Sequence, residues 1–84
     1  LYDAETGAVV PGTVFGDKHD PDESDGGGST LPPDLLLQEA VSCMGQSLDA
    51  APDVDVLAVA FCTFWHSTIG VDAAGNAQTP ILLW

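Results

Sequence analysis

The sequence predicts an α/β fold in which a mixed sheet with β-hairpins packs against one main helix. Three observations carry this prediction. Apolar residues recur with the period of a helix across residues 33–50. A continuous apolar run fills Val56–Cys62, and turn-forming residues separate short apolar runs near both ends of the chain. The expected order is therefore strand, strand, helix, strand and hairpin.

The expected helix covers residues 33–50. Pro33 suits a first helical turn, Asp34 suits the positive end of the helix dipole, and Pro52 stops the helix. One face of this helix is apolar at steps of four, three and four residues, and it consists of Leu37, Val41, Met44 and Leu48. Such a face requires a covering sheet.

The segment before the helix divides into a hairpin and a polar loop. Short apolar runs within Leu1–Phe15 flank a turn in which Gly7 can take a positive φ, and Thr13–Phe15 resumes the second strand. Residues 16–30 form an acidic, glycine-rich stretch that cannot bury apolar surface. We expect this stretch to be an exposed loop.

A buried strand and a second hairpin are expected after the helix. Unbroken apolarity over Val56–Cys62 is typical of a strand covered on both faces in a parallel sheet. Two shorter strands follow, at Thr68–Val71 and Ile81–Trp84. Their turn lies at Ala73–Asn76, where Gly75 or Asn76 can adopt a positive φ.

The charge of the chain excludes several kinds of partner. Thirteen acidic residues stand against one basic residue, Lys18, which gives a formal net charge of −12. Nucleic acids and anionic membranes recruit Lys and Arg, so we expect neither as a partner. No apolar run approaches the ~20 residues of a membrane span, and we expect a cytoplasmic protein. Cys43 and Cys62 lack the spacing of a metal site, and we expect no metal.

The candidate site is the dipeptide Trp65–His66, which directly follows the predicted buried strand. In open α/β sheets, ligands bind just outside the carboxyl ends of strands. An indole packs on the C–H face of a sugar, and an imidazole both donates and accepts hydrogen bonds. Thr63 and Ser67 flank the pair and could position a ligand. The alternative is structural: Trp65 would close the end of the core, and the other three would satisfy the strand end.

The segment from Val54 to Trp84 resembles the amino-terminal domain of FGGY-type carbohydrate kinases, especially the gluconokinase and xylulokinase branches. In that family a Met-His or Trp-His pair follows a buried strand, and a hairpin leads to a Leu-Trp step like Leu83–Trp84. The resemblance implies a partial ribonuclease H-like domain of the actin-like superfamily. Its central first strand, with the Asp-x-Gly-Thr turn that holds phosphate and metal, is missing from residues 1–84.

The resemblance implies a fragment of an ATP-dependent kinase that phosphorylates a hydroxyl of a sugar, polyol or aldonate. Trp65 and His66 would bind this acceptor, and Ser67 after the histidine favours a gluconate-like one. ATP and Mg²⁺ would be bound mainly by regions outside these residues, and no catalytic residue is expected within them. The fragment alone should be inactive and marginally folded, and the complete protein could be a homodimer.

Two alternatives remain open from the sequence. One is a non-catalytic, sugar-binding member of the actin-like superfamily. The other is a small acidic module that binds calcium through Asp17, Asp20, Asp22, Glu23 and Asp25, with His19 in the same loop. Counted from Asp20, that loop departs from the EF-hand pattern, with Asp25 in place of glycine and Leu31 in place of the final glutamate.

Overall fold

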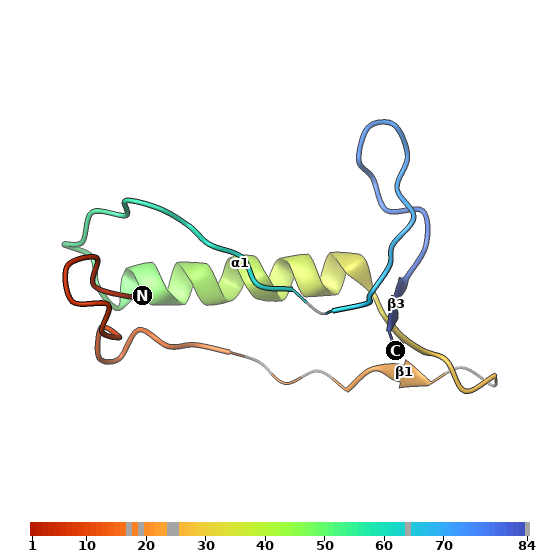
Figure 1. Cartoon of the computed structure of the whole chain (residues 1–84), viewed down its shortest axis with the longest axis horizontal. Coiled ribbons are helices and arrows are strands. Elements are labelled where there is room, and N and C mark those ends of the chain that lie inside the picture. Colours follow the sequence, from red (N-terminus) through yellow and green to blue (C-terminus); the bar gives the residue numbers. More distant parts are fainter. Residues whose placement is uncertain (17, 19, 24–25, 64, 84) are drawn as a thin grey trace. The chain divides into compact units, whose positions relative to one another are not determined.

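The computed structural model describes residues 1–16, 18, 20–23, 26–63 and 65–83 (Figure 1). It contains strands β1 (Asp22–Glu23), β2 (Ser29–Leu31) and β3 (Ile81–Leu83) and helix α1 (Pro33–Asp49). The chain divides into two compact units. Unit 1 joins Leu1–Asp17 to Glu39–Phe61, and unit 2 joins Lys18–Gln38 to Cys62–Trp84, so that α1 contributes to both.

Helix α1 forms where the periodicity predicted it and is one residue shorter than the expected 33–50. It begins at Pro33, with the Leu36 N–H donating to the Pro32 carbonyl at 3.2 Å. Asp34 occupies the first turn, where a carboxylate is favourable beside the helix dipole. At the other end, the Ala51 N–H donates to the Leu48 carbonyl at 3.1 Å, and the chain turns away before Pro52.

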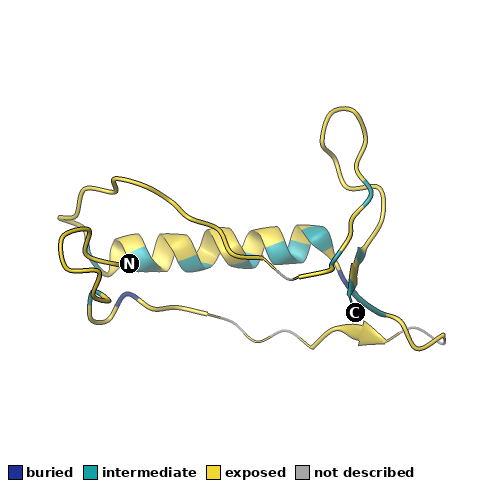
Figure 2. Ribbon diagram, in the orientation of Figure 1, coloured by how far each residue is buried: buried dark blue, intermediate teal, exposed yellow. Residues whose placement is uncertain are grey.

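The apolar face of α1 stays largely open to solvent (Figure 2). Its four residues remain 39–64% exposed, and no residue of the helix is fully buried. Within the described residues, Leu31 is the only buried apolar side chain. The described parts of the chain therefore do not supply the sheet that we expected to cover this face.

In unit 1 the expected hairpin forms, but it is short. Tyr2 and Val9 make an antiparallel bridge, and Gly7 takes the predicted positive φ of 69°. The Asp3 carboxylate accepts the Glu5 and Thr6 N–H groups at 2.9 and 2.7 Å, which holds the turn. The expected second-strand extension at Thr13–Phe15 does not form, because Thr13 instead folds back and its hydroxyl donates to the Val10 carbonyl at 2.8 Å.

Unit 2 contains a three-stranded antiparallel sheet in the order β1-β2-β3. Thr30, at the centre of β2, pairs with Asp22 on one side and with Leu82 on the other. Leu82 also bridges Thr68, and the two residues exchange backbone hydrogen bonds of 3.1 and 2.8 Å. This double pairing of Leu82 fixes the segment after residue 66 beside β3.

The prediction of a buried strand at Val56–Cys62 was wrong. These residues have no strand conformation, and Leu57, within the run, is 79% exposed. A strand requires a neighbour for its backbone hydrogen bonds. The Leu1–Phe15 hairpin pairs only with itself, and the sheet of unit 2 uses other residues, so the described chain offers this apolar run no partner.

Two further expectations need correction. The stretch 16–30, expected to be a loop throughout, contains β1 and the start of β2, because Ser29 and Thr30 pair with residues on both sides. The strand expected at Thr68–Val71 is reduced to isolated bridges at its two ends. The second hairpin otherwise forms as predicted, with β3 at Ile81–Leu83 and a φ of 87° at Gly75. Trp84 lies outside the described residues.

Candidate functional site

Trp65 and His66 form a turn that presents the indole to solvent. Trp65 is 86% exposed, the most exposed large apolar side chain among the described residues. The two rings meet edge to face, with their centroids 5.6 Å apart and their planes at 86°. A Trp that closes the end of a core would be buried, so the structural alternative for Trp65 is wrong.

The backbone of His66 lies in the left-handed region, with a φ of 63°. It is the only described residue other than glycine with a positive φ. That conformation costs a side chain about 1–2 kcal/mol, and such residues gather at functional sites. Here the conformation occurs in the turn that follows Trp65, where the imidazole and the indole lie edge to face.

A small pocket lies beside this turn, within unit 2, and has a volume of about 250 Å³. It is lined by Leu36, Thr63, Ser67, Thr68, Ile69 and Ile81. Both residues that the sequence predicted as positioning groups, Thr63 and Ser67, thus line one cavity. Trp65 and His66 lie between them in the chain but do not line it. The candidate site is therefore an exposed aromatic pair beside a pocket whose lining includes Thr63, Ser67 and Thr68.

The walls of this pocket were not identified from the sequence. Leu36 comes from the first turns of α1, Ile81 from β3, and Ile69 from the segment that bridges β3. Leu36 was visible only as part of the wider apolar stripe of the helix. No local pattern signals that a helix, a strand and a loop residue meet at one cavity, because that meeting depends on the sheet register.

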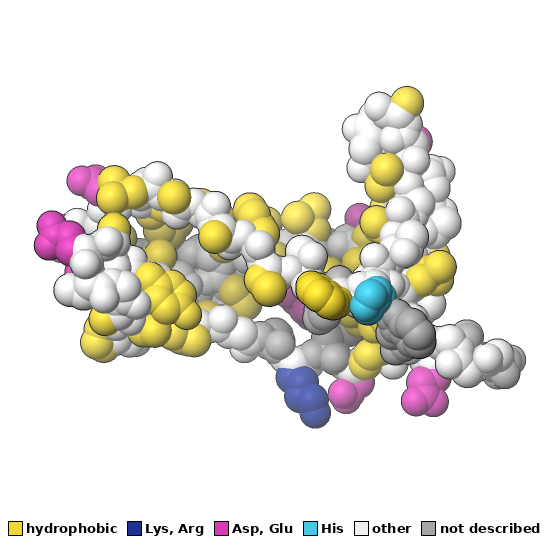
Figure 3. All heavy atoms as spheres, viewed as in Figure 1, with side chains coloured by type: hydrophobic (Ala, Val, Ile, Leu, Met, Phe, Trp, Pro, Cys, Tyr) yellow, Lys and Arg dark blue, Asp and Glu magenta, His cyan; other side chains and the backbone are white. Residues whose placement is uncertain are grey.

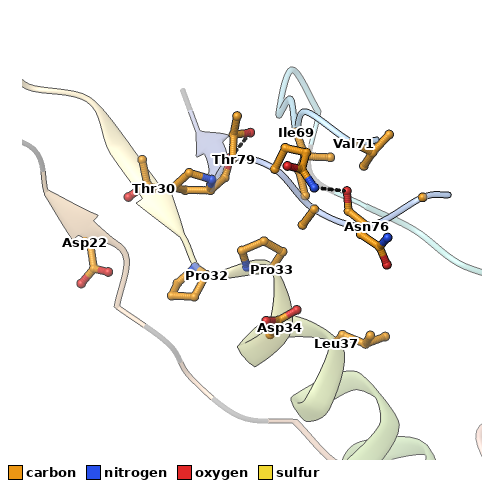
Figure 4. Close-up of a pocket in the computed structure, with 14 residues that line it drawn as sticks. Asp22, Thr30, Pro32, Pro33, Asp34, Leu37, Ile69, Val71, Asn76 and Thr79 are labelled. Carbon is orange, nitrogen blue, oxygen red and sulfur yellow. Dashed lines mark hydrogen bonds between the residues drawn. The ribbon is translucent and has the colours of Figure 1, made fainter. Parts of the chain in front are cut away.

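A larger groove of about 840 Å³ lies elsewhere in unit 2 (Figure 4). Figure 4 shows Pro33, Asp34 and Leu37 at the start of α1 on one side, and Ile69 and Asn76 across from them. None of the four predicted site residues lines this groove. It shares only Ile69 with the smaller pocket.

The loop that forms one side of the large groove is held by Asp72. Its carboxylate accepts the Ala74 and Asn76 N–H groups at 2.9 and 2.8 Å and the Asn76 side-chain amide at 2.9 Å. These hydrogen bonds, that from the Asn76 side chain above all, hold the pKa of Asp72 below its usual value. Asp72 therefore has a structural role in the hairpin.

The described residues contain no cluster of three or more His, Cys, Asp or Glu side chains that could hold a metal ion. In the acidic stretch, Lys18 and Asp20 are paired at 3.8 Å, both highly exposed, while Asp17, His19 and Asp25 lie outside the described residues. Cys43 and Cys62 are free thiols, the first half-buried and the second exposed. No helix in the described part of the chain is long and apolar enough to cross a membrane.

The surface of the molecule is rich in apolar side chains (Figure 3). Apolar side chains lie exposed in the N-terminal hairpin, on α1 and across residues 54–61. Because many other apolar side chains are also exposed, exposure alone does not identify Trp65 and His66 as a binding site. The pair is singled out by its backbone turn, its ring contact and the adjoining pocket.

No family model, no curated protein and no solved structure matches this chain.

Proposed function

We propose that residues 1–84 belong to the amino-terminal domain of an ATP-dependent carbohydrate kinase and that Trp65 and His66 bind its acceptor, a sugar, polyol or aldonate. The observation that carries the acceptor site is the 86% exposed Trp65 beside His66 and a pocket lined in part by Thr63 and Ser67. Assignment to the kinase family, with its ribonuclease H-like fold, rests on the sequence resemblance, and the cytoplasmic location is part of the same proposal.

The aromatic pair suits a carbohydrate for chemical reasons. A sugar has one face of C–H groups and a periphery of hydroxyls, so it needs an apolar plane and nearby hydrogen-bonding groups. The Trp65 indole offers the plane, and the His66 imidazole lies edge to face with it. Thr63 and Ser67 add hydroxyl groups on either side of the pair.

ATP and Mg²⁺ would be bound mainly by regions outside these residues, as the resemblance implies. The chain contains a single Lys, no Arg and, in its described part, no cluster of metal-binding side chains. A triphosphate requires cationic side chains or a cradle of backbone amides, and Mg²⁺ requires oxygen ligands. We therefore derive no phosphoryl-transfer step from these residues. Their role would be to bind and orient the acceptor, which lowers the entropic part of the barrier.

A titration of the protein that contains residues 1–84 with D-xylulose, glycerol and D-gluconate, followed through the amide chemical shifts of residues 63–67, tests the acceptor site. We expect shifts centred on residues 63–67. We expect Trp65→Ala to weaken binding about 2- to 10-fold, the range for loss of one aromatic contact. Phe61→Ala is the matched control, because Phe61 is 76% exposed and lies in unit 1. If no carbohydrate shifts residues 63–67, or if both variants weaken binding equally, the acceptor site is contradicted.

A further inference from the structure

We infer that the large groove of unit 2 binds a basic peptide, a short segment of a partner protein that carries arginine beside apolar residues. The groove is separate from the proposed acceptor site, since none of the four predicted site residues lines it. The inference therefore does not depend on the proposed function. It rests on the exposed apolar surface of the groove, on its charge and on the hydrogen-bond acceptors in its lining.

The groove has the size of a ligand site and an uncovered apolar lining. Its volume is about 840 Å³, within the range of sites that bind ligands. Leu37, Ile69 and Val71 belong to the lining and remain 37–64% exposed, and Ala77 and Pro80 add apolar surface from the hairpin. Because the free energy of burial grows with the apolar area removed from water, an occupant with apolar side chains gains by entering.

The charged side chains of the groove are all negative. Asp22 and Asp34 belong to the lining, and no basic residue does. Figure 4 shows these two acids on different elements, β1 and the start of α1. Among the described residues, neither carboxylate has a cationic partner. The chain has one basic residue against thirteen acidic ones, so charge complementarity favours an occupant that brings positive charge.

The two amide side chains in the lining present oxygen atoms as free acceptors. The side-chain N–H groups of Asn76 and Gln78 donate to the Asp72 carboxylate at 2.9 and 3.3 Å. Since a carboxylate only accepts, these contacts identify the nitrogen end of each amide and leave both amide oxygens turned away from Asp72. Within the described part of the chain, no group donates to either oxygen. The groove thus combines carboxylate and amide acceptors, while the amide nitrogens already donate to Asp72.

Arginine suits this combination of acceptors and apolar surface. A guanidinium has five N–H donors in one plane and no acceptor, so it can donate to a carboxylate and to an amide oxygen together. It is more weakly hydrated than an ammonium group, which lowers the cost of placing it against apolar side chains. A peptide also supplies apolar neighbours that cover the lining, which a small guanidinium compound lacks. A nucleic acid or other polyanion would meet two carboxylates and no cation in the groove.

The test titrates the protein that contains residues 1–84 with the peptide acetyl-Leu-Arg-Leu-Arg-Leu-amide, followed through the amide chemical shifts of residues 69–80. A matched peptide carries citrulline, which has nearly the same shape as arginine and no charge, in place of both arginines. We expect the arginine peptide to bind about 2- to 30-fold more tightly, the range for two exposed ion pairs. Agmatine, a guanidinium compound without apolar neighbours, should bind more weakly than the arginine peptide.

Two adjacent residues of β1 provide matched variants. Asp22→Asn removes a carboxylate from the groove, whereas Glu23→Gln removes one that does not line it. Both variants lose one negative charge, so the long-range attraction for a cation changes by a similar amount and the local contact differs. We expect Asp22→Asn to weaken the arginine peptide about 1.5- to 5-fold relative to Glu23→Gln. Preserved amide shifts of Thr30 and Leu82 show that both variants retain the sheet.

Three results would each overturn this inference. They are equal binding of the arginine and citrulline peptides, binding of agmatine as tight as that of the arginine peptide, and equal affinities of the two β1 variants. The carbohydrate titration reads residues 63–67, whereas the peptide titration reads residues 69–80. Either proposal can therefore fail while the other stands.

Discussion

Gly70 is the position at which the geometry of the site segment is most sensitive to one added carbon. Its N–H donates to the Thr79 hydroxyl at 2.8 Å, and its carbonyl accepts the Gln78 N–H at 2.8 Å. A Cβ at residue 70 would lie 3.1 Å from Thr79 Cγ2 and 3.3 Å from Thr79 Oγ1. Gly70→Ala therefore forces the Thr79 side chain to move.

The cost follows from the contacts that would be lost. A shift of the Thr79 side chain by a few tenths of an ångström weakens the hydrogen bond from the Gly70 N–H and the one that the Thr79 hydroxyl donates to the Pro80 carbonyl at 3.0 Å. Net contributions of about 0.5–1.5 kcal/mol are usual for one hydrogen bond, and the low end applies to exposed ones. We expect a loss of about 1 kcal/mol in the free energy of opening this hairpin, which is about a fivefold change.

Amide hydrogen exchange at the Gln78 N–H measures the free energy of opening this hairpin directly. We expect it to exchange about fivefold faster in Gly70→Ala, and Thr79→Ser to rescue the variant by removing Cγ2 while keeping the hydroxyl. Gly45→Ala is the control, because nothing lies within 4 Å of a Cβ there, so α1 should gain about 1 kcal/mol. Unchanged exchange at Gln78 in Gly70→Ala would refute the close packing of Gly70 on Thr79.

Three further outcomes are expected. Because hydrogen bonds hold the pKa of Asp72 below the ordinary aspartate value of 3.8, its contribution to the hairpin is complete above that value and is lost as the pH falls through the lowered pKa. The Asn76 amide shift should follow this titration, and a normal pKa for Asp72 would contradict it. Leu31→Ala should cost about 2–5 kcal/mol and abolish the sheet, whereas Trp65→Ala should change stability by less than about 0.5 kcal/mol, and amide hydrogen exchange at the Leu82 N–H measures both effects. Iodoacetamide should modify exposed Cys62 faster than half-buried Cys43 by mass spectrometry, and the reverse order would contradict their assigned exposures.

Features governed by local chemistry could be predicted from the sequence. The periodicity of Leu37, Val41, Met44 and Leu48 located α1 to within one residue, because helix formation depends on contacts three and four residues apart. Gly7 was predicted to take a positive φ, and of the two candidates in the second turn, Gly75 and Asn76, it is Gly75 that does so. In both cases the determining interactions lie within a few residues of each other.

Features governed by distant pairing could not be predicted in the same way. The run Val56–Cys62 has the composition of a buried strand, but composition does not supply the neighbouring backbone that a strand requires. Conversely, Asp22–Glu23 has the composition of a loop and still forms β1, because Thr30 and Ser29 present a free backbone edge. A register between segments determines both outcomes, and a single sequence does not reveal it.

The candidate site also has one part that local sequence predicts and another part that depends on the pairing of distant segments. The order of residues in one segment was enough to single out Trp65, His66, Thr63 and Ser67, and the two hydroxyl residues do line one pocket. The expectation that a strand end would position them was wrong, because the turn at His66 and the bridge from Thr68 to Leu82 do so instead. Leu36 and Ile81 could not be predicted as pocket residues, because the sequence does not reveal the bridge between Thr68 and Leu82 that brings β3 beside the site segment.

We would first follow the nuclear magnetic resonance signal of the Trp65 indole N–H while the protein is titrated with D-gluconate or D-xylulose. The loss of this signal in Trp65→Phe assigns it. If the aromatic pair binds the acceptor, the signal shifts saturably, together with the signals of His66 and Ser67. An indole signal that stays unchanged up to saturating carbohydrate would contradict the assignment of the aromatic pair as an acceptor site.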